Sequence, residues 1–303
     1  MSANNSNIST QDTLIYQVQQ YDDLDTAYEN TPDTIPQTLY LDLRGIRMKL
    51  DKETLVSLPE SLLIAMFPNG LVLGKQSYDS EEEEDEYDDS EFQSSDANSE
   101  ELLTTHVDFD PKCLEYVLDF YKRTLKEKKM EPEESLFAFS QAAQYYPSIL
   151  DKVPVIVLRE ELEYYCIYQD KKDPIKLKLA AGEYLKNENL VFAALQKNIA
   201  RANNVAEQHL IDMLCHAGFS REDRWGHREL EPNRTCINSM SLVALKSSGT
   251  DHTHQLDNTA QKLLLFWRKP ARKCWWDGNT VHIDNQPIRL WARRTWTLEL
   301  VMI

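Results

Sequence analysis

Apolar and polar residues alternate, and then recur with helical spacing, between residues 38 and 125. Residues 39–43 and 48–50 alternate on either side of Gly45, which predicts two short strands joined by a tight turn. The same reasoning predicts helices over 52–58 and 60–67, strands over 71–74 and 106–109, and a helix that begins at Asp110-Pro111. An acid at the cap followed by proline favours that last helix start.

A second pattern, richer in strand-forming residues, begins near Val153. Residues 155–168 predict a strand, 175–217 predict helices broken at 187–189 and 203–204, and 236–246 predict another strand. The C-terminal residues alternate again: Ile288, Leu290 and Ala292 oppose Arg289, Trp291 and Arg293, and Trp296, Leu298, Leu300 and Met302 oppose Thr295, Thr297, Glu299 and Val301. We therefore expect an α+β fold that ends in antiparallel strands.

Charge divides the chain further. The net charge is −17, yet residues 1–37 carry −6 and residues 76–105 carry −13, so the remainder is close to neutral. Such acidic stretches repel themselves and do not fold alone. We predict a disordered acidic tail over 1–37, a domain over 38–125 with an acidic disordered insertion at 76–105, a linker or short helix over 126–152, and an α+β regulatory domain over 153–303 with a flexible loop at 247–261.

Little in the sequence indicates catalysis. The five cysteines are widely spaced without a CxxC pair, which is typical of reduced thiols in a cytoplasmic protein, with the nucleus as the alternative compartment. His209, Cys215 and His216 lack a second ligand pair for zinc, and no phosphate loop, dinucleotide motif or HExxH is present. No apolar run reaches the roughly 18 residues of a membrane span. We expect no enzyme activity, no metal and no cofactor.

One basic and aromatic window, Lys262–Trp276, is the candidate contact site. This window holds no acidic residue. The candidate contact residues in it are Arg268, Lys269, Arg272, Lys273, Trp275 and Trp276, and two arginines of the last predicted strand, Arg293 and Arg294, join them. This composition suits nucleic acid, anionic lipid or an acidic protein surface. Alternatively, 263–267 is a core strand and the tryptophans pack beneath arginines such as Arg293. The net negative charge argues against nucleic acid.

The acidic insertion offers two further hypotheses. Ser80 precedes four glutamates, a context that suits phosphorylation by an acid-directed kinase. The insertion could also pair with the basic window and mask it, or serve only to keep the protein in solution.

Two resemblances extend these expectations. The strand hairpin, the helix pair through SLPESLL, the following strand and FDPKCLEYVLDFY resemble the BTB/POZ fold, in particular its potassium-channel-tetramerisation branch, although the usual glycine pair of the hairpin is reduced to Gly45. This resemblance covers about residues 38–125. It implies a protein-interaction domain with a surface for self-association.

The second resemblance covers most of the chain. LREELEYYCIY, KLAAGEYL, AEQHLIDMLCHAGF, LLLFWRKPARKCWW and IRLWARRTWTLEL are similar to the fungal growth-regulation proteins of the "whiskey" class. It implies a non-catalytic regulator that binds and activates a plasma-membrane phosphatase of the aspartate-nucleophile type, supports the general stress response and restrains nutrient-driven (TOR-type) growth signalling. Membrane association would then be indirect, through the phosphatase. The alternative is a BTB substrate adaptor of a cullin ubiquitin ligase.

Overall fold

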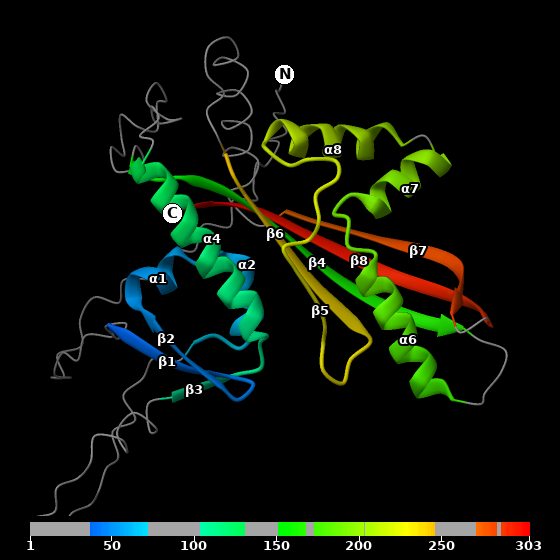
Figure 1. Ribbon diagram of the computed structural model, residues 1–303, viewed down its shortest axis with the longest axis horizontal. Coiled ribbons are helices and arrows are strands. Elements are labelled where there is room, and N and C mark those ends of the chain that lie inside the picture. The colour runs from blue at the N-terminus through cyan, green and yellow to red at the C-terminus, as the bar shows by residue number, and fades with distance from the viewer. Residues whose placement is uncertain are drawn as a thin grey trace, which may run out of the picture. The chain divides into compact units, whose positions relative to one another are not determined.

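The computed structural model describes residues 37–71, 104–130, 151–167, 173–202, 204–245, 271–283 and 286–303 (Figure 1). Several predictions lie outside these ranges: the tail over 1–37 apart from its last residue, almost all of the acidic insertion with Ser80, the flexible loop at 247–261, and the strand expected from residue 71 onward. The described residues form an α+β protein built on two sheets.

The first sheet is small and contains the predicted hairpin. β1 (Thr38–Leu43) pairs with β2 (Ile46–Asp51) in antiparallel fashion and with β3 (Thr104–Val107) in parallel, giving the order β2-β1-β3. Gly45 closes the turn at a φ of 89°, a left-handed conformation that glycine adopts without strain. The sequence prediction of two strands around Gly45 is confirmed.

Three helices pack on this sheet. Asp51 caps α1 (Lys52–Ser57) by accepting a 2.7 Å hydrogen bond from the Thr54 amide, and α2 (Glu60–Met66) follows directly. α4 (Pro111–Met130) begins at the predicted proline and continues into the segment expected as a linker. Their buried faces close a core that includes Leu41, Leu62 and Leu114, each fully buried.

The second sheet has five antiparallel strands in the order β5-β6-β4-β8-β7. Their bounds are β4 Pro154–Ile167, β5 His227–Leu230, β6 Cys236–Ala244, β7 Ala271–Ile283 and β8 Gln286–Met302. β4, β6 and β8 confirm the strands expected from the alternating pattern. β5 and β7 were not predicted, because neither shows a contrast between apolar and polar positions.

Helices cover one face of the large sheet (Figure 1). α6 (Pro174–Asn187), α7 (Ala193–Ala202) and α8 (Val205–His216) lie in the predicted helical region, with interruptions where they were expected. Asp173 and Asn204 cap α6 and α8 through their side chains, which explains where these helices begin. The buried residues beneath them include Ile156, Leu158, Leu162 and Leu290.

The other face of the large sheet packs partly against the described residues 37–71 and 104–130. Val155, Val157, Met240 and Leu242 join the same buried cluster as the leucines of β1. A polar contact reinforces the junction: buried Glu299 accepts hydrogen bonds from the Ser61 hydroxyl at 2.6 Å and from the Ser61 amide at 3.1 Å. Residues 37–71 and 104–130 therefore share one core with the large sheet.

Candidate functional site

The candidate window is divided by the alternation of β7. Within the described part of this window, Arg272 and Trp276 point to one face of the sheet, while Lys273 and Trp275 point to the helix-covered face. Arg268 and Lys269 lie outside the described residues. Four neighbours in sequence thus belong to two different environments.

Lys273 and Trp275, which face the helices, contact residues on the inner side of the sheet. The Lys273 Nζ lies 3.1 Å from the Glu207 Oε1 and 5.5 Å from the centre of the Trp275 ring. Trp275 in turn meets Trp296 edge to face, with ring centres 5.4 Å apart. The alternative expectation placed the tryptophans beneath arginines such as Arg293; Trp275 packs instead against Trp296 on the helix-covered side of the sheet and is half-buried.

Arg294 requires a correction, because it was expected on the contact surface and is instead buried. Its Nη1 donates to the Glu160 Oε2 at 2.9 Å, and the other Glu160 oxygen accepts from Arg228 Nη1 at 2.6 Å. Trp296 Nε1 also donates to Glu160 at 2.9 Å. Burial by itself would raise the pKa of Glu160, but the two guanidinium groups outweigh it and hold that pKa below its usual value. Arg294 is therefore part of an interior charge cluster.

The outward residues form a surface that we call the open face, made of the exposed residues Tyr165, Arg272, Trp276, Arg289 and Arg293 and the half-buried Trp291. Pairing between β4, β8 and β7 places Trp291 beside Tyr165, and Arg293 beside Trp276. The rings of Tyr165 and Trp276 stack at 6.1 Å, and these residues remain 49% and 57% exposed. Arg293, an expected contact residue, lies at the centre of this surface.

Local contacts orient the side chains of the open face. The Arg293 guanidinium bonds Glu163 at 2.9 Å, and the Arg289 guanidinium lies 5.0 Å from the centre of the Trp291 ring. Gly278 allows the Trp291 ring to lie close to the backbone, since a Cβ at this position would meet the ring at 3.0 Å. Contacts of this kind restrict side-chain rotamers, and such restriction lowers the entropy cost of binding.

The open face is the end of the sheet that the described residues 37–71 and 104–130 do not reach. Near Val155 and Val157 this side of β4 is buried, whereas Glu161, Tyr165 and Ile167 on the same side are exposed. Within the described ranges, no helix packs on this end. Arg272 and Arg289 have no ion pair among the described residues, so the surface can offer positive charge.

The open face is rich in side-chain types that protein interfaces use. Tryptophan, tyrosine and arginine are the residues that dominate binding energy in protein interfaces. Burial raises the pKa of the Cys113 thiol and of the Cys236 thiol to about 12, which makes both poor nucleophiles. Groups of three or more metal-ligating side chains are absent from the described part of the chain. The helices described here are all too short or too polar to cross a membrane.

Sequence reasoning found part of this site. The alternation of 288–293 indicated that Arg289, Trp291 and Arg293 share a face. Tyr165 was missed as a contact residue, because its neighbours in sequence are also aromatic or apolar and do not show which side is exposed.

The fold and the open face define an α+β protein of two packed sheets with an exposed aromatic and arginine surface. No family model and no solved structure matches the chain. A WHI2-like protein of Schizosaccharomyces pombe is 32% identical over 275 residues, which cover 86% of both chains. The chain belongs to the WHI2-like family.

Two further relatives are more distant. A protein of Saccharomyces cerevisiae named growth regulation protein is 26% identical over 308 residues, covering 82% of this chain and 60% of that protein. An uncharacterized protein of S. pombe is 25% identical over 285 residues, covering 93% of each chain.

Proposed function

We propose that this protein is a non-catalytic regulator of growth that acts by binding another protein, and that the open face is its main contact surface. The observation that carries this proposal is the ordered group of Tyr165, Trp276 and Trp291 beside Arg289 and Arg293. The name of the S. cerevisiae relative supports a role in growth regulation.

The partner in this proposal is a plasma-membrane phosphatase of the aspartate-nucleophile type, which the protein binds and activates. Its action supports the stress response and restrains nutrient-driven growth signalling. The resemblance of the C-terminal sequence blocks to fungal growth regulators supports this choice. The unpaired guanidinium groups of Arg272 and Arg289 suit an acidic surface on the phosphatase. The protein then reaches the membrane only through its partner.

In the same proposal, residues 38–125 form a BTB-type interaction domain and a surface for self-association. The order of hairpin, two short helices, parallel strand and long helix supports this assignment. Because this region shares its core with β4 and β6, tests should use the full chain.

The test compares a variant that lacks exposed side chains of the open face with a control variant that lacks exposed side chains elsewhere. Trp276→Ser combined with Arg272→Ser deletes one exposed ring and one cation. Ile175→Ser combined with Arg234→Ser deletes an exposed apolar side chain and an exposed cation away from the open face. Recovery of the phosphatase with the tagged full-length protein is measured by quantitative affinity purification.

We expect the open-face variant to recover the phosphatase at least about tenfold less well, because truncating an interface tryptophan commonly weakens binding by about 2 kcal/mol or more. The matched control should recover wild-type amounts. Circular dichroism and urea unfolding must show both variants folded. Equal recovery by all three proteins would refute the open face as the contact surface. Recovery of a cullin without the phosphatase would instead favour the ubiquitin-ligase adaptor.

A further inference from the structure

β7 is the outermost strand of the large sheet, so one of its edges has no neighbouring strand among the described residues (Figure 1). It is 13 residues long, whereas strands usually have about 5–6 residues. It pairs with β8 continuously from Ala271 to Ile283, and neither a bulge nor a proline interrupts it. The outer edge of such a strand carries backbone N–H and C=O groups that pair with another chain when one is available.

The hydrogen bonds of the sheet show which residues of β7 direct their backbone groups to this free edge. Val153 and Ile303, which continue the β4–β8 register, exchange two backbone bonds of 2.8 and 3.0 Å. Odd-numbered residues of β8 therefore bond β4, and even-numbered ones bond the odd-numbered residues of β7. The even-numbered residues of β7 are left to face the free edge: Arg272, Cys274, Trp276, Gly278, Thr280 and His282.

These six residues are accessible, and their side chains lie on the open-face side of the sheet. All except the half-buried Gly278 are exposed. Within the described ranges, their outward amides and carbonyls have no hydrogen-bond partner. The opposite edge of the sheet is closed: β5 pairs with β6, and beyond the end of β5 the Tyr116 hydroxyl accepts a bond of 3.2 Å from the Leu242 amide.

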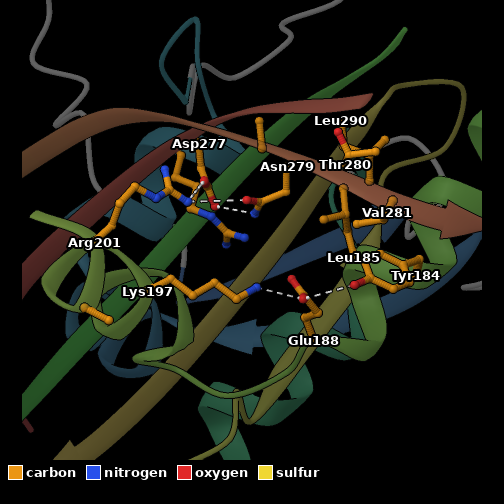
Figure 2. Close-up of a pocket in the computed structure, with 13 residues that line it drawn as sticks. Tyr184, Leu185, Glu188, Lys197, Arg201, Asp277, Asn279, Thr280, Val281 and Leu290 are labelled. Carbon is orange, nitrogen blue, oxygen red and sulfur yellow. Dashed lines mark hydrogen bonds and ion pairs between the residues drawn. The ribbon is translucent and has the colours of Figure 1, made fainter. Parts of the chain in front are cut away.

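On the helix-covered side, α7 is tied to the middle of β7. The Arg201 Nη2 donates to the Asn279 Oδ1 at 3.4 Å, and both residues border a pocket of about 530 Å³ together with Asp277 (Figure 2). The open-face side of β7 carries no helix among the described residues. A strand added at the free edge would have every second side chain on that uncovered side.

The charges along this edge favour an acidic strand. The six open-face positions of β7 include Arg272 and His282 but no acid, and Arg272 has no ion pair among the described residues. Lys273, whose side chain points to the other side, is already bound to Glu207 at 3.1 Å. Opposite charges on directly paired residues stabilise a strand pair, and like charges destabilise it.

We propose that an extended acidic segment of the partner protein binds the free edge of β7 as an added antiparallel strand. Its backbone N–H and C=O groups bond those of Cys274 and Trp276, and one of its carboxylates lies opposite Arg272. The main-chain bonds supply affinity, and the side chains that face the open face supply specificity. This binding mode rests on the proposed function only for the identity of the partner.

Hydrogen exchange of the full-length protein tests whether the edge is free. The amides of Cys274 and Trp276 should exchange at least about tenfold faster than those of Lys273 and Trp275, which bond β8. Slow exchange of Cys274 and Trp276 would show that another segment of this chain, or a second copy of it, already pairs with the edge. That result would overturn strand addition by a partner.

A seven-residue peptide that alternates threonine and glutamate serves as the probe. In the proposed pairing, the glutamates lie on the open-face side and their own N–H groups bond β7. Nuclear magnetic resonance should show saturable shifts of the Cys274 and Trp276 amides. A peptide N-methylated at the glutamates should bind at least about tenfold more weakly than one N-methylated at the threonines, because only the former loses the bonding N–H groups. A lysine-for-glutamate peptide should bind at least about threefold more weakly at low salt.

The result that would overturn the proposal is equal binding of the two N-methylated peptides, or no saturable shift up to about 5 mM peptide. Stronger binding of the lysine peptide would refute the preference for an acidic segment.

A pair of variants carries the test to the partner. Cys274→Pro removes an outward N–H without removing a bond to β8, and Cys274→Ala keeps that N–H. Peptide binding and recovery of the phosphatase should both fall at least about tenfold in Cys274→Pro and stay unchanged in Cys274→Ala. Urea unfolding must show both variants folded, and the N-methylated peptides decide the question on wild-type protein if the proline variant does not fold.

The outcomes separate this binding mode from the proposed function. If the combined Trp276→Ser and Arg272→Ser variant loses the phosphatase while Cys274→Pro retains it, the contact surface stands and strand addition is wrong. If Cys274→Pro abolishes peptide binding but wild-type protein recovers no phosphatase, the edge site stands and the identity of the partner is wrong.

Discussion

Glu160 and Glu161 are adjacent on β4 and have opposite surroundings. Glu160 is 1% exposed and bonds Arg228, Arg294 and Trp296, whereas the Glu161 side chain is 55% exposed and lies 3.6 Å from Arg159. A buried charge that loses its partner is costly, while an exposed ion pair contributes little. Adjacent residues of a strand face opposite sides of the sheet, so Glu160 carries a buried charge that supports the fold and Glu161 carries an exposed one.

We predict that Glu160→Gln lowers the free energy of unfolding by about 3–5 kcal/mol, because it leaves two buried guanidinium groups without their counter-charge. Glu161→Gln should change it by less than about 1 kcal/mol. Urea unfolding followed by circular dichroism measures both. Similar values for the two variants would contradict the interior role of Glu160.

The same carboxylate predicts a dependence on pH. The pKa of Glu160 is lowered in the folded protein, so its contribution to stability is complete above the ordinary glutamate pKa of 4.5 and is lost as the pH falls through the lower folded value. Wild-type protein should lose stability in acid more steeply than Glu160→Gln. Unfolding curves measured from pH 7 down to about pH 3 test this expectation; parallel losses in the two proteins would count against it.

At the scale of elements, the contact between α6 and β4 depends on a glycine in the middle of a helix. A Cβ on Gly182 would lie 2.5 Å from the Tyr164 hydroxyl oxygen and 2.8 Å from a Leu230 methyl carbon. The hydroxyl also donates to the Lys178 carbonyl at 3.2 Å, so it cannot move freely. Glycine at this position allows the helix to pack closely on the strand.

Gly182→Ala should therefore destabilise the protein by about 1–3 kcal/mol through overpacking. In an open helix the same change would instead stabilise by up to about 1 kcal/mol. Glu183→Ala, at the exposed next position, serves as the control and should stay within about 0.5 kcal/mol of wild type. Thermal unfolding shows whether Gly182→Ala destabilises or stabilises the protein. A more stable Gly182→Ala protein would show that α6 can move away from β4.

At the scale of the whole described structure, the two sheets share a core and should unfold together. Leu242 belongs to β6 of the large sheet, yet it packs in the cluster that contains Leu41 and Leu114. The Leu242 amide also donates to the Tyr116 hydroxyl at 3.2 Å. Removing this side chain consequently weakens both halves at once.

Leu242→Ala should lower the free energy of unfolding by about 2–5 kcal/mol, and both halves should report the same loss. All six tryptophans lie between residues 225 and 296, so their fluorescence reports only the C-terminal half. Hydrogen exchange of the α4 amides reports the other half. Two separate transitions in wild-type protein would contradict a shared core.

The local patterns predicted a large part of the fold but only part of the site. Alternation and capping residues indicated β1, β2, β4, β6, β8 and most helices, because each of these has one buried face. β7 was missed because Arg272, Lys273, Trp275 and Trp276 place aromatic and charged groups on both faces. Only its pairing with β8 shows that Arg272 and Trp276 belong to the open face while Lys273 and Trp275 face the helices.

The sequence by itself determined the α+β class, the alternation of the last strand and the family. Tertiary structure alone decided which face of each strand is covered, and by what. Glu160 and Arg294 are 134 positions apart, and nothing near either residue shows that they meet. Alternation along a strand shows which residues share a side. Which side is buried depends on packing against segments that are distant in the sequence. For this reason one side of the sheet became an exposed aromatic surface and the other an interior of charges and a pocket.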